Sequence, residues 1–474
     1  MKGKFLDFWR RVETGPIMFE KEYMTRHYYP LLKQTCEKYG FKYEEGTNGL
    51  PSEVVPCNNE TIDNIWEAAK EFVVKCGVLC QNTERVIYFT EDEVNDAMYH
   101  VPKKVTVGSH TDEYTWKHRG LEDYGVRNSG KNPNVAMGRI LGPITDDVYE
   151  KVGMSFVKEP MVDMMHFQGV IAHLDGVDIK PFSPFEMMSE MKRVSKVKDV
   201  CRRGGRPYLH DGASMPISLQ AEMMGTYGPG INPGDAHHVY LQPHLKTNYD
   251  EMCRALMWHQ FGSQTWGIGM AYIGSIPGAA ATSAVNCLAE LIAYETLYQP
   301  TMLGVWPTDA LYFSNSSKYS LFVANWAVAA MHKHTKIPSI LGAAWQMTSR
   351  IGYEYFWETA AGAIGSVSLG AGTSGGTGEQ SGGTNCAAGI GARFAAEVGR
   401  AVGEADLKRE EANEMVIKCL GKYQKFINDR TAHKMGWLFQ ECYDLDTIEP
   451  LDKLNKVYKK VKGEMRKELG LRID

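Results

Sequence analysis

The chain has 474 residues, 43% of them hydrophobic, and its 52 basic and 57 acidic residues give a formal net charge of −5. Because these charges form no basic stripe, nucleic acid is excluded as an expected partner. No apolar run reaches the roughly 18 residues of a membrane span. The opening MKGKFLDFWRRVETG lacks the apolar core of a secretion signal. We therefore expect a cytoplasmic protein that does not contact a membrane.

Cysteine use excludes two further classes. Ten cysteines in a chain of this length are too few for a disulfide scaffold. Cys76 and Cys80 are spaced like half of a zinc module, but no second pair follows, and two buried thiols on one helix explain the spacing. We expect no bound metal.

Residues 1–140 are expected to form an extension packed on the main domain. Thr61–Lys75 repeats apolar residues at helical spacing, which predicts an amphipathic helix. Thr90–Tyr99 begins with a good N-cap and acidic residues, so it is a second expected helix. Lys103–Val107 is expected to be a short strand.

From residue 141 to about residue 400, apolar strands alternate with amphipathic helices. The expected strands are Met161–Val170, Pro207–Asp211, His237–Gln242, Gly267–Ile276, Ala310–Ser314 and Ile337–Gly342. The expected helices are 184–203, 215–225, 247–260, 278–298 and 319–334. Such alternation predicts a parallel sheet with helical crossovers.

This α/β pattern favours a (β/α)8 TIM barrel. The six units and the 356–370 region approach the eight units that closure needs. The turn after Val170 lacks the glycine fingerprint of a dinucleotide-binding sheet. Helices between residues 401 and 474 are expected to complete the same domain.

The glycine-rich segment Leu369–Cys386 is of low complexity. It contains a formal G-x-G-x-x-G at Gly370, Gly372 and Gly375, but no helix follows at once and no P-loop lysine is present. We expect a flexible surface loop, with a mobile lid over the barrel mouth as the functional alternative.

Polar side chains follow several expected strands, where the active site of a barrel lies. The candidates for catalysis are Asp211, His238 and His237. The candidates for substrate binding are Gln168, His210, Asn315, Trp345 and Gln346. Because neighbouring residues of a strand face opposite sides, only one of His237 and His238 can point into a regular barrel.

The sequence resembles the monomethylamine methyltransferases, which pass a methyl group from an amine to a corrinoid protein. The similar patches are Lys75–Met98, Gly142–Tyr149, Ser183–Pro184, Gly204–Pro207, Gly274–Gly278, Ala392–Ala401 and Phe439–Leu445. The resemblance implies the barrel fold, a corrinoid carried by a cognate partner protein, and no cofactor bound tightly by this chain. We also expect a homo-oligomer.

The residues that the family uses for catalysis differ in this chain. The family's pyrrolysine falls on Asp211 if one gap is allowed and on Gly212 otherwise, and no lysine lies near it. Its two active-site glutamates fall on His238 and near Ile268, and its glutamine and tyrosine fall around 342–344. The resemblance thus implies methyl transfer from a substrate that needs no lysine-derived electrophile.

A quaternary or otherwise activated methylamine meets that condition, because it needs only an aromatic and acidic cage. Asp211 is then the expected counter-ion, His238 the proton donor for other leaving groups, and Trp266 and Trp306 candidate cation-binding faces. Two alternatives stay open. One is a metal-dependent lyase or hydrolase using Asp211, His210 and either His237 or His238, and the other is a non-catalytic binding relative.

Overall fold

The structure is a computed structural model of the whole chain. It describes residues 2–41, 53–109, 112–121, 136–140, 144–167, 171, 173–210, 217–228, 234–340, 347–378 and 384–473. Five of the residues singled out above, Gln168, Asp211, Gly212, Trp345 and Gln346, lie outside these ranges.

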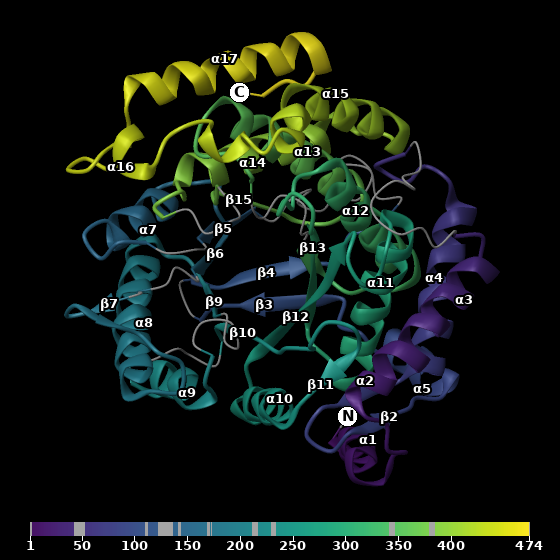
Figure 1. The fold of residues 1–474 in the computed structure, drawn as a ribbon. Helices are drawn as coiled ribbons and strands as arrows, with labels where there is room; N and C mark the ends of the chain where they lie inside the picture. Colours follow the sequence, from purple (N-terminus) through teal and green to yellow (C-terminus); the bar gives the residue numbers. More distant parts are fainter. Residues whose placement is uncertain are drawn as a thin grey trace.

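An eight-stranded parallel sheet forms the centre of the molecule (Figure 1). Its strands are β5 (Ala136–Ile140), β6 (Met164–Phe167), β9 (Tyr208–His210), β10 (Ala236–His238), β12 (Gln264–Ile273), β13 (Met302–Asp309), β14 (Ser339–Ile340) and β15 (Thr373–Gly375). Their spatial order is β14-β13-β12-β10-β9-β6-β5-β15, with β15 beside the first strand of the sheet. The α/β class predicted from the sequence is confirmed.

A helix follows each strand of this sheet. The helices are α7 (Tyr149–Val157), α8 (Pro184–Gly204), α9 (Leu219–Tyr227), α10 (Tyr249–Phe261), α11 (Ala280–Leu297), α12 (Lys318–His334), α13 (Tyr353–Ser368) and α14 (Gly389–Ala405). Figure 1 shows them surrounding the curled sheet. The two edge strands approach each other, since Gly372 N donates to Ser339 O at 3.0 Å.

A hairpin covers the amino end of the curled sheet. Strands β3 (Lys104–Val107) and β4 (Tyr114–Lys117) pair antiparallel and cross the centre of the ring in Figure 1. Gly108 N donates to Gly234 O at 2.7 Å, just before β10, and His118 Nδ1 lies 3.1 Å from Ile337 O, just before β14. The carboxyl ends of the strands are therefore on the side away from the hairpin.

The glycine-rich segment is not a surface loop throughout, which corrects the expectation from composition. Residues Thr373–Gly375 form β15 and are buried in the sheet. A Cβ on Gly375 would lie 2.8 Å from the Ala395 side chain and from the Gly391 backbone of α14. Small residues are needed here because a helix packs closely on the strand.

One expected strand was placed too late in the sequence. Ala310–Ser314 is a turn that follows β13, whereas the strand itself spans Met302–Asp309. Asp309 N donates to Ser314 O at 2.8 Å, and Phe313 has a φ of 49°. Leu311 and Phe313 of this turn are exposed, so their hydrophobicity reflects a surface loop and not a buried strand.

The described residues of the amino-terminal extension form six helical segments and a small sheet. The helical segments are α1 (Lys2–Thr14), α2 (Glu20–Glu22), η1 (Tyr23–Tyr28), α3 (Tyr29–Lys38), α4 (Asn59–Cys76) and α5 (Glu91–Tyr99). The sheet consists of β1 (Val78–Cys80), β2 (Arg85–Ile87) and β11 (Lys246–Thr247), which follows β10. The predicted N-cap of α5 is confirmed, because Thr90 and Glu93 form a capping box.

Near the carboxyl terminus, α15 (Arg409–Asn428) and α17 (Asp452–Leu469) pack beside α13. Between them lie η3 (Ala432–Lys434), α16 (Phe439–Cys442), β16 (Tyr443–Asp444) and β17 (Glu449–Pro450). A further hairpin, β7 (His173–Leu174) and β8 (Val177–Asp178), precedes α8.

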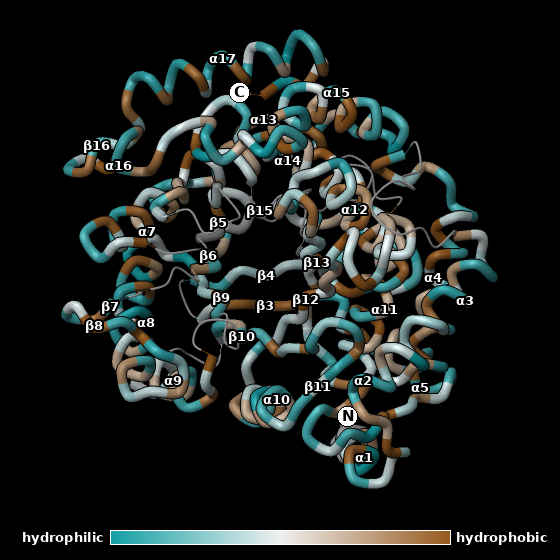
Figure 2. The backbone as a smooth tube through the Cα atoms, viewed as in Figure 1, coloured by the Kyte–Doolittle hydropathy of each residue, from teal (hydrophilic) through white to brown (hydrophobic). Residues whose placement is uncertain are grey.

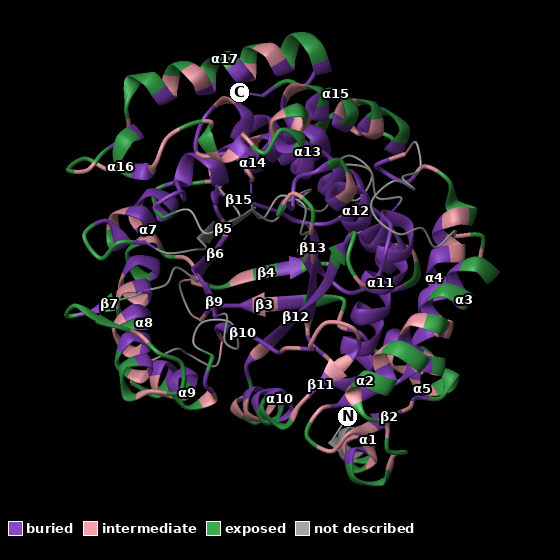
Figure 3. Cartoon of the chain, in the orientation of Figure 1, coloured by how far each residue is buried: buried purple, intermediate pink, exposed green. Residues whose placement is uncertain are grey.

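Burial follows the layers of the fold. Figure 3 shows α11 and strands β9, β10 and β12 of the central sheet mostly buried, while α17 and α5 expose one side. Figure 2 shows the same division in hydropathy, with teal on the outer turns of α17 and brown on β3. Within the ranges that the structure describes, there is no helix whose length and hydropathy would let it cross a membrane.

Candidate functional site

His237 and His238 point to opposite faces of β10, as strand geometry predicts. His238 stacks on Trp266 of β12, with ring centroids 4.5 Å apart at an interplanar angle of 26°. His237 stacks on Trp258 of α10, with ring centroids 3.6 Å apart at 18°. The helix lies outside the curled sheet, so His238 faces the inner space and His237 faces the helix layer.

Aromatic and imidazole rings gather around His238 on the inner face. The Tyr240 ring lies 4.6 Å from His238 at an angle of 61°. His166 of β6 meets the edge of Trp266 at 4.9 Å. Tyr240 and Trp306 pack against the apolar cluster inside the sheet, which includes Trp266. Four strands, β6, β10, β12 and β13, and the segment after β10 thus bring five rings to one region.

Lysine and arginine are absent from most of the strands near these rings. Strands β6, β9, β10, β12 and β13 contain neither residue, whereas the neighbouring β5 carries Arg139, which pairs in register with His166. Trp306 pairs with Met270 in the register of β12 and β13 and is partly exposed. The negative faces of such rings attract an ammonium ion.

His210 lies on the outer face of β9, so it does not face the inner space where the substrate was expected to bind. Its Nε2 is 2.8 Å from Glu190 Oε1 of α8. Arg193, one turn later on α8, donates to both oxygens of Glu190 at 2.6 Å. Burial opposes ionisation of Glu190, but Arg193 and His210 lower its pKa below the usual value.

Glu222 of α9 occupies the other side of His210. Arg254 Nε of α10 donates to Glu222 Oε2 at 2.5 Å, and Trp258 Nε1 donates to Oε1 at 3.0 Å. Burial favours the neutral acid, yet Arg254 and His210 lower the pKa of Glu222 to about 2. Burial also lowers the pKa of His210, but the Glu190 and Glu222 carboxylates outweigh it and the net shift is upward.

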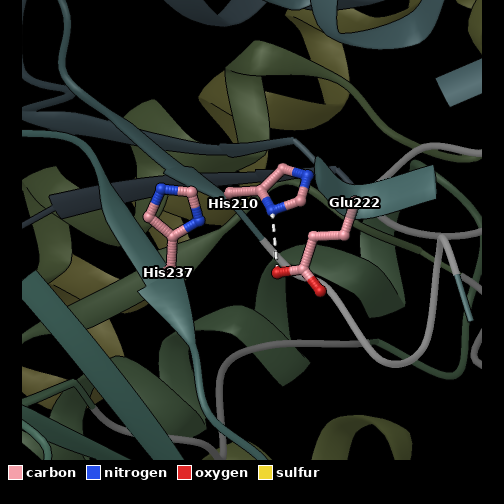
Figure 4. Close-up of side chains that lie close together, drawn as sticks. All are labelled: His210, Glu222 and His237. Atoms are coloured by element: carbon pink, nitrogen blue, oxygen red, sulfur yellow. Dashed lines mark ion pairs between the residues drawn. The ribbon is translucent and has the colours of Figure 1, made fainter. Parts of the chain in front are cut away.

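Figure 4 shows His210, Glu222 and His237 pointing toward one another. One ligand atom from each lies within 4.8 Å of the others, and all three residues are buried. His210 Nδ1 is 3.6 Å from a Glu222 oxygen. Among the described residues, neither ring nitrogen of His237 has a hydrogen-bond partner. Burial and the neighbouring His210 hold the pKa of His237 well below its usual value, so the ring is neutral.

Asn315 braces the carboxyl end of β13. Its Nδ2 donates to Pro307 O at 2.6 Å and to Thr308 Oγ1 at 2.9 Å, and its side chain is buried. Asn315 therefore lies at the end of a strand, as expected. Its contact with a substrate stays a prediction. Gln168, Asp211, Trp345 and Gln346 lie outside the described residues, so their site assignment also stays a prediction.

Sequence reasoning missed the acidic and basic residues of the outer cluster. Glu190 and Arg193 lie three residues apart on α8, as do Glu251 and Arg254 on α10. Both pairs share the sequence pattern E-M-x-R, in SEMKR and DEMCR. Such pairs usually mark a solvated helix face. The repetition of the E-M-x-R pattern on two helices is the feature of the sequence that could have revealed this cluster.

Comparison with known proteins gives a match over most of the chain. The model of the family described as monomethylamine methyltransferase MtmB matches residues 4–471. Monomethylamine methyltransferase MtmB2 of Methanosarcina acetivorans is 26% identical over 468 residues, covering 98% of this chain and 97% of the relative. Monomethylamine methyltransferase MtmB of Methanosarcina mazei is 26% identical over 480 residues, with the same coverage.

Solved structures agree with this match. The crystal structure of the Methanosarcina barkeri monomethylamine methyltransferase superposes with a TM-score of 0.88 at 24% identity, covering 99% of this chain and 98% of the other. The crystal structure of a hydroxylamine MtmB complex gives a TM-score of 0.87 at 24% identity, with the same coverage. These likenesses show a shared fold.

Proposed function

Because the chain belongs to the monomethylamine methyltransferase family, we propose that it transfers a methyl group from a small methylated amine to the Co(I) corrinoid of a partner protein. The membership confirms the resemblance and the enzyme class predicted from the sequence. We further propose that the curled sheet closes as a (β/α)8 barrel, with the methyl donor bound on its inner face. A quaternary or otherwise activated methylamine is the proposed donor.

The observation that carries this choice of donor is the group of rings around Trp266. His238 and His166 contact that indole, Tyr240 contacts His238, and Trp306 lies on the neighbouring strand. A quaternary ammonium binds to such surfaces through its diffuse charge and apolar methyl groups, without hydrogen-bond donors of its own. No lysine-derived electrophile is needed to hold it.

The chain's residues bind and orient the donor in this proposal. The corrinoid supplies a strongly nucleophilic cobalt, so the protein's main task is to hold the methyl group in line with it. The methyl carbon is transferred to the cobalt, which supplies the electron pair of the new bond. The C–N bond breaks, its electron pair stays on nitrogen, and a quaternary amine leaves as a neutral tertiary amine. That step needs no proton. For a donor whose leaving group requires one, we assign the proton to His238.

Asp211 is the proposed counter-ion. It directly follows His210, the last residue of β9, at a carboxyl end where barrel enzymes place their active-site residues. A carboxylate there balances the positive charge of the bound donor. Gln168 after β6, and Trp345 and Gln346 after β14, keep the proposed role of substrate contacts for the same reason.

The partner is proposed to approach the carboxyl ends of the strands, since the hairpin β3–β4 covers the amino ends. Large apolar side chains are exposed in the loops there. Phe313 is 65% exposed and Leu311 47% exposed after β13, and Phe182 is 69% exposed before α8. Leu311 and Phe313 also line a hollow with Arg430. Exposed apolar residues of this kind favour association with another protein.

The outer cluster does not favour the lyase or hydrolase alternative. His210 and Glu222 are completely buried between β9 and α9, and His237 is completely buried against α10. A substrate would have to separate the helix layer from the sheet to reach them. Catalysis is accordingly proposed for the inner face and not for this cluster.

The test uses the purified chain with a reduced corrinoid protein and a panel of methylamines. Methyl transfer is followed by the change in corrinoid absorbance as Co(I) is consumed. We expect turnover with a quaternary or other activated amine and none of comparable rate with monomethylamine. Equal turnover of monomethylamine would show that the proposed donor class is wrong. A panel in which no methylated amine reacts would contradict the proposed reaction.

A further inference from the structure

His210, Glu222 and His237 form a three-residue donor set that methyl transfer does not use. They come from β9, α9 and β10, and their ligand atoms lie within 4.8 Å of one another. Two imidazoles and one carboxylate are a donor set that zinc prefers among biological divalent ions. Magnesium and calcium prefer oxygen donors, so they fit this set less well.

The spacing of the donors fits a transition-metal ion. His210 Nδ1 and a Glu222 oxygen are 3.6 Å apart. With metal–ligand bonds of about 2.0–2.1 Å, two ligands of a tetrahedral ion are separated by roughly 3.4 Å. A small inward movement of the side chains would therefore place an ion between them, with His237 completing the set.

The surroundings of the three donors also match a metal centre. His210 uses its other nitrogen, Nε2, to contact the Glu190 carboxylate at 2.8 Å. A carboxylate behind a ligating histidine fixes the orientation of the ring and is a common arrangement around bound metals. Trp258 holds Glu222 through its Nε1 and holds the His237 ring by stacking. Each donor is thus oriented by a neighbour.

His237 provides the second, independent indication. Its side chain is completely buried, and neither of its ring nitrogens has a hydrogen-bond partner among the described residues. A buried polar group without a partner costs free energy. A metal ion bound to one of the nitrogens would remove part of that cost.

From this geometry we infer that His210, Glu222 and His237 bind a divalent transition-metal ion, with zinc as the expected occupant. The ion ties the carboxyl end of β9 to β10 and α9. Because all three ligands are buried, its role is structural, and this inference goes beyond the proposed function. The alternative to a metal ion is a proton that His210 shares with Glu190 and Glu222. Arg193 and Arg254 already balance part of the negative charge of these two carboxylates.

The first test needs no variant. Protein purified without a metal-binding tag is analysed for metals, and apoprotein prepared with a chelator is titrated with Zn²⁺ and with Co²⁺. We expect about one zinc per chain, and visible d–d absorption on addition of Co²⁺, which reports nitrogen and oxygen ligands. Protein that lacks stoichiometric metal and binds neither added ion would overturn the inference and favour the proton.

Substitution then locates the ion. His237→Gln suits this purpose because the His237 ring makes no hydrogen bond that its loss would leave unsatisfied among the described residues. We expect metal content to fall below about a tenth of the wild-type value. Glu190→Gln, behind His210, is expected to weaken binding by about 10–100-fold.

The matched control is His259→Gln, a partly buried histidine of α10 outside the set, which should keep its metal. Retention of the metal by His237→Gln would place it elsewhere and overturn the assignment. These readouts are independent of methyl transfer, so failure of the metal site and failure of the proposed reaction can be told apart.

Discussion

On the outer face of β9 and β10, His210 lies between carboxylates that pair with guanidinium groups, and His237 stacks on Trp258. On the inner face, His238 lies among the rings of Trp266 and Tyr240. The two faces differ in how their polar groups are satisfied. Ion pairs hold most of the outer groups in place, while the inner face presents π surfaces to whatever binds there. We infer that the outer face keeps the strands and helices in position, whereas the inner face is available to bind a cationic methyl donor.

The largest expected effect comes from breaking an outer ion pair. Arg254→Leu leaves Glu222 and Glu251 buried without their shared guanidinium. Removing one partner of a buried pair costs about 3–5 kcal/mol of unfolding free energy, because the remaining charge is uncompensated. Urea denaturation followed by circular dichroism measures this.

The control for this prediction is Arg10→Ala. Arg10 pairs with Asp7 at the surface, with side chains 76% and 61% exposed. Exposed pairs contribute about 0–1 kcal/mol. If Arg254→Leu is no more destabilising than this control, the outer cluster does not maintain the geometry of the sheet.

A second outer residue, Glu290 of α11, predicts a dependence of stability on pH. Its oxygens accept hydrogen bonds from Met270 N at 2.7 Å and from His244 N at 3.0 Å. Burial nevertheless raises its pKa from 4.5 to about 8. The folded chain therefore keeps a proton that the unfolded chain releases between these values. Its stabilising contribution is present below about pH 4.5 and is lost as the pH rises through about 8.

Glu290→Gln tests this dependence because glutamine is neutral at every pH and has nearly the same shape. Between pH 5 and 8 we expect the free energy of unfolding of the wild type to fall by up to about 1.4 kcal/mol per pH unit because of Glu290. The variant should lack this contribution. Measuring the free energies of unfolding of both proteins across that pH range tests this prediction. Parallel profiles for the two proteins would mean that Glu290 is already ionised in the folded state.

A smaller effect is expected on the inner face, from Trp306→Leu. If the indole contacts a cationic donor, its loss removes about 1–2 kcal/mol of binding, which corresponds to roughly a tenfold rise in KM. Since donor and transition state both lose this contact, kcat should change little. Trp306→Phe keeps an aromatic face and should recover part of the affinity. A fall in kcat with an unchanged KM would assign Trp306 a different role.

Much of the fold was predictable because long helices repeat their apolar residues. The helix expected at 184–203 is α8 (Pro184–Gly204), and that expected at 319–334 is α12 (Lys318–His334). Strand β15 was not predictable, since its residues Thr-Ser-Gly lie within a glycine-rich tract and become a strand only through pairing with β5. Tertiary pairing overrode local composition there.

The candidate site was predictable in part. Strand alternation correctly required His237 and His238 to face opposite sides, but it could not say which one faces inward. That choice depends on Trp266 and Trp258, which come from β12 and α10. Glu222 was missed because an acidic residue on a helix is usually solvated, whereas here it is buried beside His210 of β9 and Arg254 of α10.

The central claim is that the inner face binds a methylated ammonium ion, and a crystal structure with tetramethylammonium tests it most directly. We expect the nitrogen of the ligand within about 6 Å of the Trp306 ring centroid, on the side of the sheet that carries His238. One methyl group should point toward the carboxyl ends of the strands. A ligand bound elsewhere on the chain, with the inner face occupied only by protein side chains, would contradict the account.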